Sequence, residues 1–168
     1  PIYEDIKDVY HELFDEALKR YNDKQTRKDR KIDDYYEKIR SGKQEKLFHE
    51  VILQIGDKDN MGSETMEGQL AAKILDEYMK GFQERNPTLR VFAAHLHLDE
   101  ATPHLHIDFI PYVTGSKRGL DTRVSLKQAL SSLGFKGGSR SETELNQWVQ
   151  SEKEKLAMVM RGNEIEWD

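Results

Sequence analysis

Apolar residues recur at helical spacing in several stretches of the chain. They follow an i, i+3, i+4, i+7 pattern from Ile6 to Tyr21, and they follow i+4 steps from Met66 to Phe82 until Asn86-Pro87 interrupts the pattern. Shorter stretches of the same kind lie between and after these two. The spacing predicts helices over residues 4–21, 34–40, 63–85, 125–133 and from 141 onward.

Polar residues that favour helix ends mark two of these helices. Asp33 is expected to cap the helix over 34–40, and Gly42 is expected to end it. Ser141 and Glu144 have the spacing of a capping box, which predicts that the last helix begins at Ser141.

Alternation of apolar and polar residues predicts three strands, over 47–55, 90–98 and 103–113. Only residues 99–102 separate the last two, so these strands are expected to form an antiparallel hairpin. The order of the elements predicts an α+β fold in which helices flank an antiparallel sheet. Three strands make a thin sheet, and we expect further strands to be hidden in the loops or to be missing from this chain.

Composition narrows the setting of the protein. The chain has 168 residues, enough for a single domain with a hydrophobic core, and it has no cysteine, which excludes disulfides and thiolate metal ligands. No apolar run approaches the roughly 18 residues of a membrane span, and no signal-peptide pattern opens the sequence. We therefore expect a cytoplasmic protein without a membrane partner. Because the first residue is Pro1 and not Met, we also expect residues 1–168 to be cut from a longer protein.

Basic residues gather in two segments although the formal net charge is −5. Residues 19–31 and residues 114–140 each carry a net charge of +5, and the rest of the chain carries −15. Local basic surface neutralises phosphates whatever the net charge of the whole protein. The two segments are therefore candidate DNA-binding surfaces; the alternative is that they are solvated loops with no partner.

Four of the six histidines lie within twelve residues, in the sequence AHLHLDEATPHLH. His95 and His97 share one face of their predicted strand, as do His104 and His106. A four-residue turn sets His97 opposite His104 and His95 opposite His106, with Cβ atoms about 5 Å apart. All four imidazoles are therefore expected on one patch of the sheet.

A metal ion accounts for this crowding better than a solvent-facing role does, because neutral imidazole is a common metal ligand. Three histidines that leave a coordination position open are typical of a catalytic site. We expect one divalent ion, with Mn²⁺ first and Mg²⁺, Zn²⁺, Ni²⁺ and Co²⁺ as alternatives.

The two faces of the hairpin are expected to differ. One face should pack in the core and carries Phe92, Ala94, Leu96, Leu98, Leu105, Ile107 and Phe109. The histidine face should continue into side chains that support the metal ligands, namely His95, Asp99, Glu50 and Gln54.

The segment HLDEATPHLH, from His97 to His106, resembles the HxDExTPHxH motif of the Mob/Pre relaxases, the plasmid mobilisation and recombination enzymes. These enzymes belong to the HUH endonucleases, which are named for a His-hydrophobic-His triplet. The flanking stretches YNDKQTRKDRKIDDYYEKI, RGLDTRVSLKQAL and GFKGGSRSETELNQW also resemble the family. The resemblance therefore covers nearly the whole chain.

The resemblance implies a bacterial relaxase domain with an HUH-like fold, which nicks and rejoins one DNA strand at a plasmid origin of transfer. A side-chain nucleophile would form a covalent protein–5′-phosphate and leave a free 3′-OH. By position, the metal ligands are implied to be His97, His104 and His106, and Glu100 is implied to be a catalytic residue that touches the metal or orients a ligand. The implied partners are single-stranded origin DNA and other mobilisation or conjugation proteins.

The nucleophile of this family lies on an N-terminal strand ahead of the first helix, and no such strand precedes Tyr3 in the sequence. The resemblance therefore implies that the nucleophile and one strand of the sheet are missing from this chain. Tyr35 and Tyr36 are an alternative inside the chain, because adjacent tyrosines are nucleophiles in some other HUH enzymes. Packing is the ordinary role of such a pair.

The basic segments supply the residues expected to contact DNA, which are Arg27, Lys28, Arg30, Lys117, Arg118, Arg123, Lys127, Lys136 and Arg140. Other functions stay open: a replication initiator or transposase of the same fold, a DNA-binding module that keeps the metal for structure alone, and a hydrolase of small phosphate esters. The basic segments and the DExTP linker favour DNA as the substrate.

Overall fold

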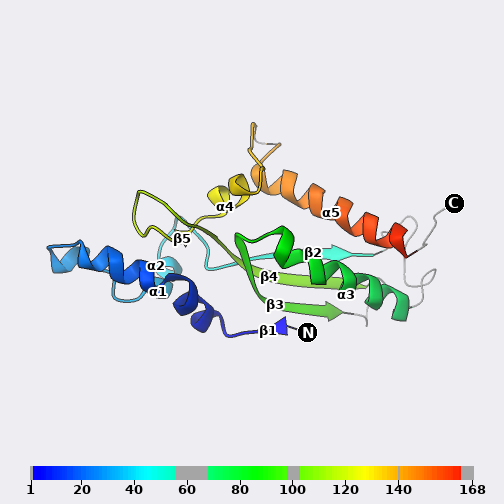
Figure 1. Cartoon of the computed structure of the whole chain (residues 1–168), viewed down its shortest axis with the longest axis horizontal. Coiled ribbons are helices and arrows are strands. Elements are labelled where there is room, and N and C mark those ends of the chain that lie inside the picture. Colours follow the sequence, from blue (N-terminus) through cyan, green and yellow to red (C-terminus); the bar gives the residue numbers. More distant parts are fainter. Residues whose placement is uncertain (1, 56–67, 98–102, 140, 164–168) are drawn as a thin grey trace.

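The computed structural model describes residues 2–55, 68–97, 103–139 and 141–163. The elements are β1 (Ile2–Tyr3), α1 (Ile6–Asp23), a 3₁₀ turn (Lys28–Arg30), α2 (Tyr35–Ser41), β2 (His49–Gln54), α3 (Gly68–Arg85), β3 (Leu89–His97), β4 (His104–Val113), β5 (Arg123–Val124), α4 (Leu126–Ser132) and α5 (Glu144–Gly162) (Figure 1). The predicted α+β class is confirmed. None of the described helices is both long enough and apolar enough to cross a membrane.

The sheet has the strand order β1-β3-β4-β2, with β5 paired to β4 outside this path, and every pair is antiparallel. The three predicted strands correspond to β2, β3 and β4, and the predicted hairpin is confirmed. The strands that the pattern did not reveal, β1 and β5, have two residues each, which is too short for alternation to be visible. The predicted turn at 99–102 lies outside the described residues.

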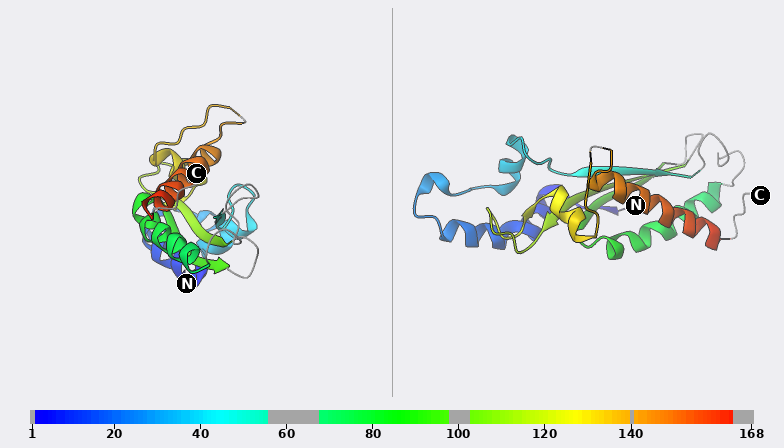
Figure 2. Two further views of the ribbon diagram at one scale, coloured as in Figure 1. Left: turned by 90° about the vertical axis from the view of Figure 1, so that its right-hand side faces the viewer. Right: turned by 90° about the horizontal axis from the view of Figure 1, so that it is seen from above.

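One face of the sheet packs against α3, α4 and α5, which lie along it (Figure 2). Leu53, Ile107 and Phe109 point to this side, and each is at most 2% exposed. The rings of Phe109 and Trp148 meet edge to face with centroids 5.5 Å apart. Burial of each such side chain contributes roughly 1.5–3 kcal/mol, so this cluster is the main hydrophobic core.

A buried carboxylate joins α3 to α5. Glu152 accepts hydrogen bonds on Oε1 from the Tyr78 hydroxyl at 2.6 Å and from Arg85 Nη2 at 2.8 Å. Asn86 donates to Glu152 Oε2 at 3.3 Å and accepts from Trp148 Nε1 at 3.0 Å. The carboxylate is 3% exposed, and these polar partners replace the water that it loses on burial.

The opposite face of the sheet is covered at one end by α1 and α2. Phe14 and Tyr35 of these helices pack there against Phe92 and Ile110 of the sheet. The predicted place of Phe92 on the main core face is wrong. A β-bulge in β3 shifts the strand register just before Ala93, and an extra residue in a strand turns its side chain to the other face.

Leu96 and Leu98 are also predicted core residues. Leu96 lies opposite Leu105 as expected, but it is 37% exposed, because it sits near the end of β3. Leu98 lies outside the described residues.

Two predicted helix caps are wrong by one or two positions. Asp34 and not Asp33 caps α2, and Thr143 and not Ser141 caps α5. In each case the capping residue has extended backbone, and its side-chain oxygen accepts from the amide three residues on. Gly42 ends α2 as predicted, and α3 ends at Arg85 as predicted, whereas the predicted start of α3 at residue 63 lies outside the described residues.

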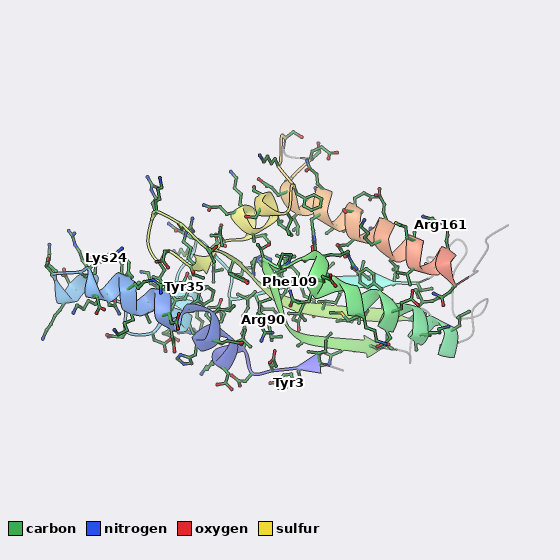
Figure 3. The ribbon with its side chains drawn as sticks, in the orientation of Figure 1. Tyr3, Lys24, Tyr35, Arg90, Phe109 and Arg161 are labelled. Carbon is green, nitrogen blue, oxygen red and sulfur yellow. The ribbon has the colours of Figure 1, made fainter. Side chains whose placement is uncertain are left out.

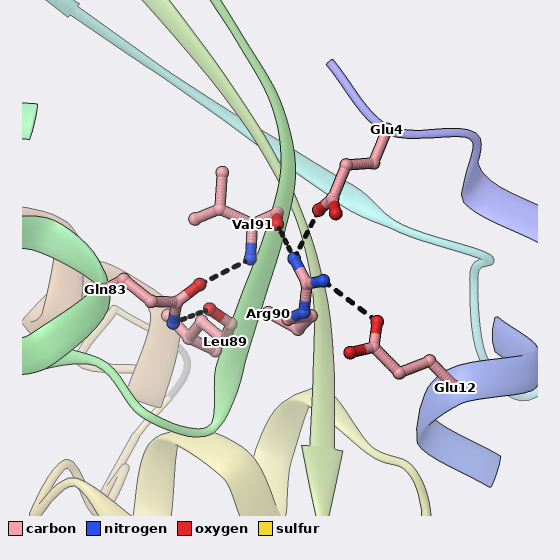
Figure 4. Close-up of polar contacts among 6 residues, drawn as sticks. All are labelled: Glu4, Glu12, Gln83, Leu89, Arg90 and Val91. Atoms are coloured by element: carbon pink, nitrogen blue, oxygen red, sulfur yellow. Dashed lines mark hydrogen bonds and ion pairs between the residues drawn. The ribbon is translucent and has the colours of Figure 1, made fainter. Parts of the chain in front are cut away.

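The outer edge of β3 is held by side chains on either side of it (Figure 4). Gln83 of α3 accepts from the Val91 amide at 2.9 Å and donates to the Leu89 carbonyl at 2.7 Å. Arg90 pairs with two carboxylates of the N-terminal segment, Glu4 at 2.7 Å and Glu12 at 3.0 Å. The Gln83 contacts thus join α3 to β3, and the Arg90 ion pairs fasten the N-terminal segment and α1 to the sheet.

Candidate metal centre and nucleic-acid interface

Strand pairing gathers four histidines on one face of the sheet. His95 lies opposite His106, and His97 lies opposite His104, so the predicted register of the hairpin is confirmed. β2 continues this face and sets Gln54 opposite His104. The histidines occupy the end of the face that α1 and α2 leave open, beyond the cluster around Ile110 and Phe92.

Three of these imidazoles are close neighbours. The ring centroids of His97 and His106 are 4.4 Å apart, and those of His104 and His106 are 6.4 Å apart. Imidazoles bound to one ion through bonds of about 2.0–2.1 Å have centroids roughly 4.5–5.5 Å apart, so the first pair is suitably spaced and His104 has to turn inward. Within the described ranges, no three metal-binding side chains already converge on one point. The donor set therefore fits a metal ion in its chemistry and in sharing one face of the sheet, whereas its side chains do not converge on a common point.

A carboxylate lies beside one of the candidate ligands. Glu50 Oε1 is 3.4 Å from Nδ1 of His106, so Nε2 is the nitrogen of that ring with which the side chain would bind an ion. A carboxylate on the far nitrogen of a metal-bound histidine fixes the ring and raises its basicity. This contact supports the predicted role of Glu50.

Besides His106, Glu50 has an acidic neighbour, because the strand register sets Asp108 directly opposite it. Burial, together with a hydrogen bond to Glu50, raises the pKa of Asp108 to about 7. The hydrogen bond with Asp108 lowers the pKa of Glu50. Of the two carboxyl groups, Glu50 is therefore the one that ionises first as pH rises, and it is the one that lies beside His106.

The remaining residues predicted to support the site are placed as follows. His95 is exposed on the histidine face, across from His106, and Gln54 is exposed at the end of β2. Asp99 and Glu100 lie outside the described residues.

Tyr35 lies at the α1–α2 end of the molecule (Figure 3), and Tyr36 follows it in α2. Tyr35 is 8% exposed, its hydroxyl accepts from the Val124 amide at 3.0 Å, and burial raises its pKa. Tyr36 meets the ring of Tyr10 edge-on with centroids 5.2 Å apart. The structure thus gives both tyrosines a packing role at the covered end of this face and brings neither to the end that carries the histidines.

The two basic segments meet at the same end of the molecule. Arg20 donates from Nε and Nη2 to the carboxylate of Asp121 at 2.9 and 2.8 Å, which joins α1 to the loop before β5. Predicted DNA-binding residues that are exposed are Arg27, Lys28, Arg30, Lys117, Arg118, Lys127 and Lys136. Arg123 is half-buried and donates to the Ser116 hydroxyl at 2.8 Å, and Arg140 lies outside the described residues. Among the exposed residues, Arg27 already pairs with Asp29 at 2.8 Å.

A cleft of about 660 Å³ opens at this end of the molecule, between α2 with residues 42–45 and the second basic segment. Lys38 and Lys43 line one side of it, and Arg118 and Arg123 line the other. Sequence reasoning missed Lys38 and Lys43, because they are far from Arg118 along the chain and no local pattern links them.

Comparison with known proteins gives one match. The family model Mob_Pre, described as plasmid recombination enzyme, matches residues 3–164, which include the histidine hairpin and both basic segments. No curated protein and no solved structure gave a significant match.

Proposed function

The chain belongs to the plasmid recombination enzyme family, and we propose that it is a metal-dependent relaxase domain that nicks and rejoins one DNA strand at a plasmid origin of transfer. The observation that carries the proposal is the histidine face of the β3–β4 hairpin, where His97 and His106 lie 4.4 Å apart by ring centroid and Glu50 lies beside His106. Three histidines that leave coordination positions open are the ligand set of a catalytic divalent ion.

His97, His104 and His106 are the proposed ligands, and Mn²⁺ is the proposed ion. A divalent ion held there supplies positive charge beside the scissile phosphate, where negative charge develops. Glu50 holds the proton on Nδ1 of His106, so that Nε2 keeps its lone pair for the ion. Glu100 remains a proposed catalytic residue, on the family motif alone.

Cleavage on this proposal is a transesterification. The nucleophilic side chain loses its proton and forms a bond to phosphorus, the bond from phosphorus to the 3′ oxygen breaks, and the 3′ oxygen takes up a proton; rejoining is the reverse. A nucleophile must lie within about 3 Å of the phosphorus. We assign none of the described residues to this role, and in particular neither Tyr35 nor Tyr36, which pack at the other end of the molecule.

Single-stranded DNA is the proposed substrate, bound through the basic segments. Each phosphate contact releases counterions from the DNA, so affinity should fall as the salt concentration rises. The slope of log K against log salt should be about −0.7 for each phosphate contact with a single strand. The exposed lysines and arginines of the 3₁₀ turn and of the loop before β5 are the proposed contacts.

Strand cleavage by the full-length protein tests the proposal. A labelled origin oligonucleotide is incubated with Mn²⁺ and resolved on a denaturing gel, and Mn²⁺ binding is measured by titration calorimetry. The wild type should form a covalent adduct and bind one Mn²⁺, and the double variant His97→Ala/His106→Ala should lose both. His11→Ala, on the exposed side of α1, is the matched control and should keep both. Adduct formation by the double variant at the wild-type rate would refute metal-dependent cleavage at this face.

A further inference from the structure

The cleft at the α1–α2 end of the molecule has two walls. One wall is the last turn of α2 with residues 42–45, and the other is the loop that leads from residue 118 into β5. The hydrogen bond from the Val124 amide to the Tyr35 hydroxyl at 3.0 Å joins the two walls, and the Arg20–Asp121 pair at 2.8 Å fixes the loop on α1. The cleft is therefore shaped before any ligand arrives.

A third contact fixes the apolar side of the cleft. Asn22 donates from Nδ2 to the Ile32 carbonyl and accepts on Oδ1 from the Ile32 amide, both at 2.8 Å. This pair of hydrogen bonds closes the basic loop after α1 and holds Ile32 in the lining. Tyr21 and Ile39 extend the same lining.

The charge of the cleft is strongly positive. Four cationic side chains line it against one carboxylate, that of Glu45, which already accepts from the Leu126 amide at 3.3 Å. Lys38, Lys43 and Arg118 form no ion pair with any other residue that the structure describes. A cleft that holds several cationic side chains without paired carboxylates attracts anionic ligands.

The cleft is lined by both cationic and apolar side chains, and this combination favours one kind of anion. An inorganic anion needs only the cations, whereas this cleft adds two tyrosine rings and two isoleucine side chains at the same place. Nucleic acid bases stack on aromatic side chains, and their phosphates pair with lysine and arginine. A nucleotide unit of single-stranded DNA presents both groups together.

The cleft is remote from the histidine face. Val113 at the end of β4 pairs with Arg123, which lines the cleft, and it lies seven residues beyond His106. At about 3.3 Å per residue of strand, the two sites are roughly 23 Å apart. A ligand in the cleft therefore does not take part in bond cleavage.

We propose that this cleft binds one nucleotide of the single strand at a distance from the cleaved phosphate, with the base against Tyr21 and the flanking phosphates on Lys43 and Arg118. The inference rests on the proposed function, because it takes single-stranded DNA as the substrate. The cleft thereby anchors the strand, and it sets which stretch of DNA reaches the histidine face.

Fluorescence anisotropy with a labelled single-stranded origin oligonucleotide tests the charges. The double variant Lys43→Ala/Arg118→Ala should bind about tenfold more weakly or worse, and its slope of log K against log salt should be shallower by about 1.4, for two lost phosphate contacts. The control variant Lys73→Ala/Lys155→Ala removes the same charge from exposed positions on α3 and α5 and should bind as the wild type does. Equal affinity and slope for the two double variants would overturn the assignment.

The base is tested with 2-aminopurine placed at successive positions of the oligonucleotide. At one position the emission should change on binding, Tyr21→Ala should abolish that change, and Tyr21→Phe should retain it because the ring can still stack. If the charge variants weaken binding but no position responds, the nucleotide assignment is overturned in favour of a plain backbone groove. If the wild type cleaves the origin and the cleft variants bind normally, the cleft inference alone fails; if the full-length wild type does not bind the strand at all, the proposed function fails first.

Discussion

Glu50 and His106 meet along a diagonal of the sheet. The strand register sets Glu50 opposite Asp108, one row away from the histidines, yet its Oε1 lies 3.4 Å from Nδ1 of His106. The carboxylate therefore links the acidic row of the sheet to the row of candidate ligands.

Glu50→Ala should weaken Mn²⁺ binding by about 10- to 100-fold, because His106 loses the group that orients its ring and fixes its proton. Titration calorimetry of the purified protein measures this. Glu77→Ala, an exposed carboxylate on α3, is the control and should leave the affinity unchanged. Unchanged Mn²⁺ affinity in Glu50→Ala would mean that the carboxylate does not support a metal ligand.

Tyr35→Phe and Tyr36→Phe should both leave strand cleavage by the full-length protein intact. The two variants should differ in stability. Tyr35→Phe leaves the buried Val124 amide without its acceptor and should lower the free energy of unfolding by about 1–2 kcal/mol, whereas Tyr36→Phe should change it by less than about 0.5 kcal/mol. Urea unfolding and the cleavage gel check the two parts. Loss of the covalent adduct in either variant would instead make that tyrosine the nucleophile.

Glu152→Ala should lower the free energy of unfolding by about 3 kcal/mol, because it leaves the buried polar groups of Tyr78 and Asn86 without their acceptor and frees the charge of Arg85. Glu154→Ala, exposed two residues along α5, should change it by less than about 0.5 kcal/mol. Chemical denaturation measures both. Similar values for the two variants would show that the α3–α5 joint does not depend on the carboxylate.

His49 should make the protein less stable in mild acid. Burial lowers its pKa below the ordinary value of 6.5, so below pH 6.5 the unfolded chain takes up a proton that the folded chain resists. The free energy of unfolding should therefore fall as pH drops from 6.5 toward the folded-state pKa. His49→Asn should reduce this loss between pH 7.5 and 5.5, with EDTA present to remove metal, and urea midpoints at the two pH values measure it.

His11 provides the contrast for the same experiment. Its hydrogen bond to Asp15 raises its pKa, so its contribution is present below pH 6.5 and is lost as pH rises through the folded-state pKa. His11→Asn should therefore steepen the loss of stability in acid, slightly, because the side chain is exposed. If His49→Asn leaves the acid dependence unchanged, the burial of His49 does not control it.

The histidine hairpin could be predicted from sequence because two local rules leave one solution. Side chains alternate along a strand, and a four-residue link fixes which residues face one another, so the pairing of His97 with His104 follows. The face on which Phe92 lies could not be predicted in the same way, because a β-bulge adds a residue to one strand and leaves no local pattern in the sequence.

The rest of the site depends on contacts that are distant in sequence. Lys43 and Arg118 come together only because α2 and the loop before β5 pack at one end of the sheet, and no periodicity in the sequence indicates that packing.

The choice of Asp33 over Asp34 as the cap of α2 was wrong for a smaller reason. Both are good capping residues, and only the position of the extended backbone decides between them.

The carboxamide of Gln83 has a consequence for the behaviour of the protein in concentrated solution. It accepts a hydrogen bond from the Val91 amide and donates one to the Leu89 carbonyl, which are the groups that a strand from a second molecule would need for pairing. Next to them, the Glu4 amide donates to the Phe92 carbonyl. Unpaired strand edges are templates for self-association and fibril growth. A single side chain from α3 thus removes this stretch of β3 from the surfaces through which copies of the protein could aggregate.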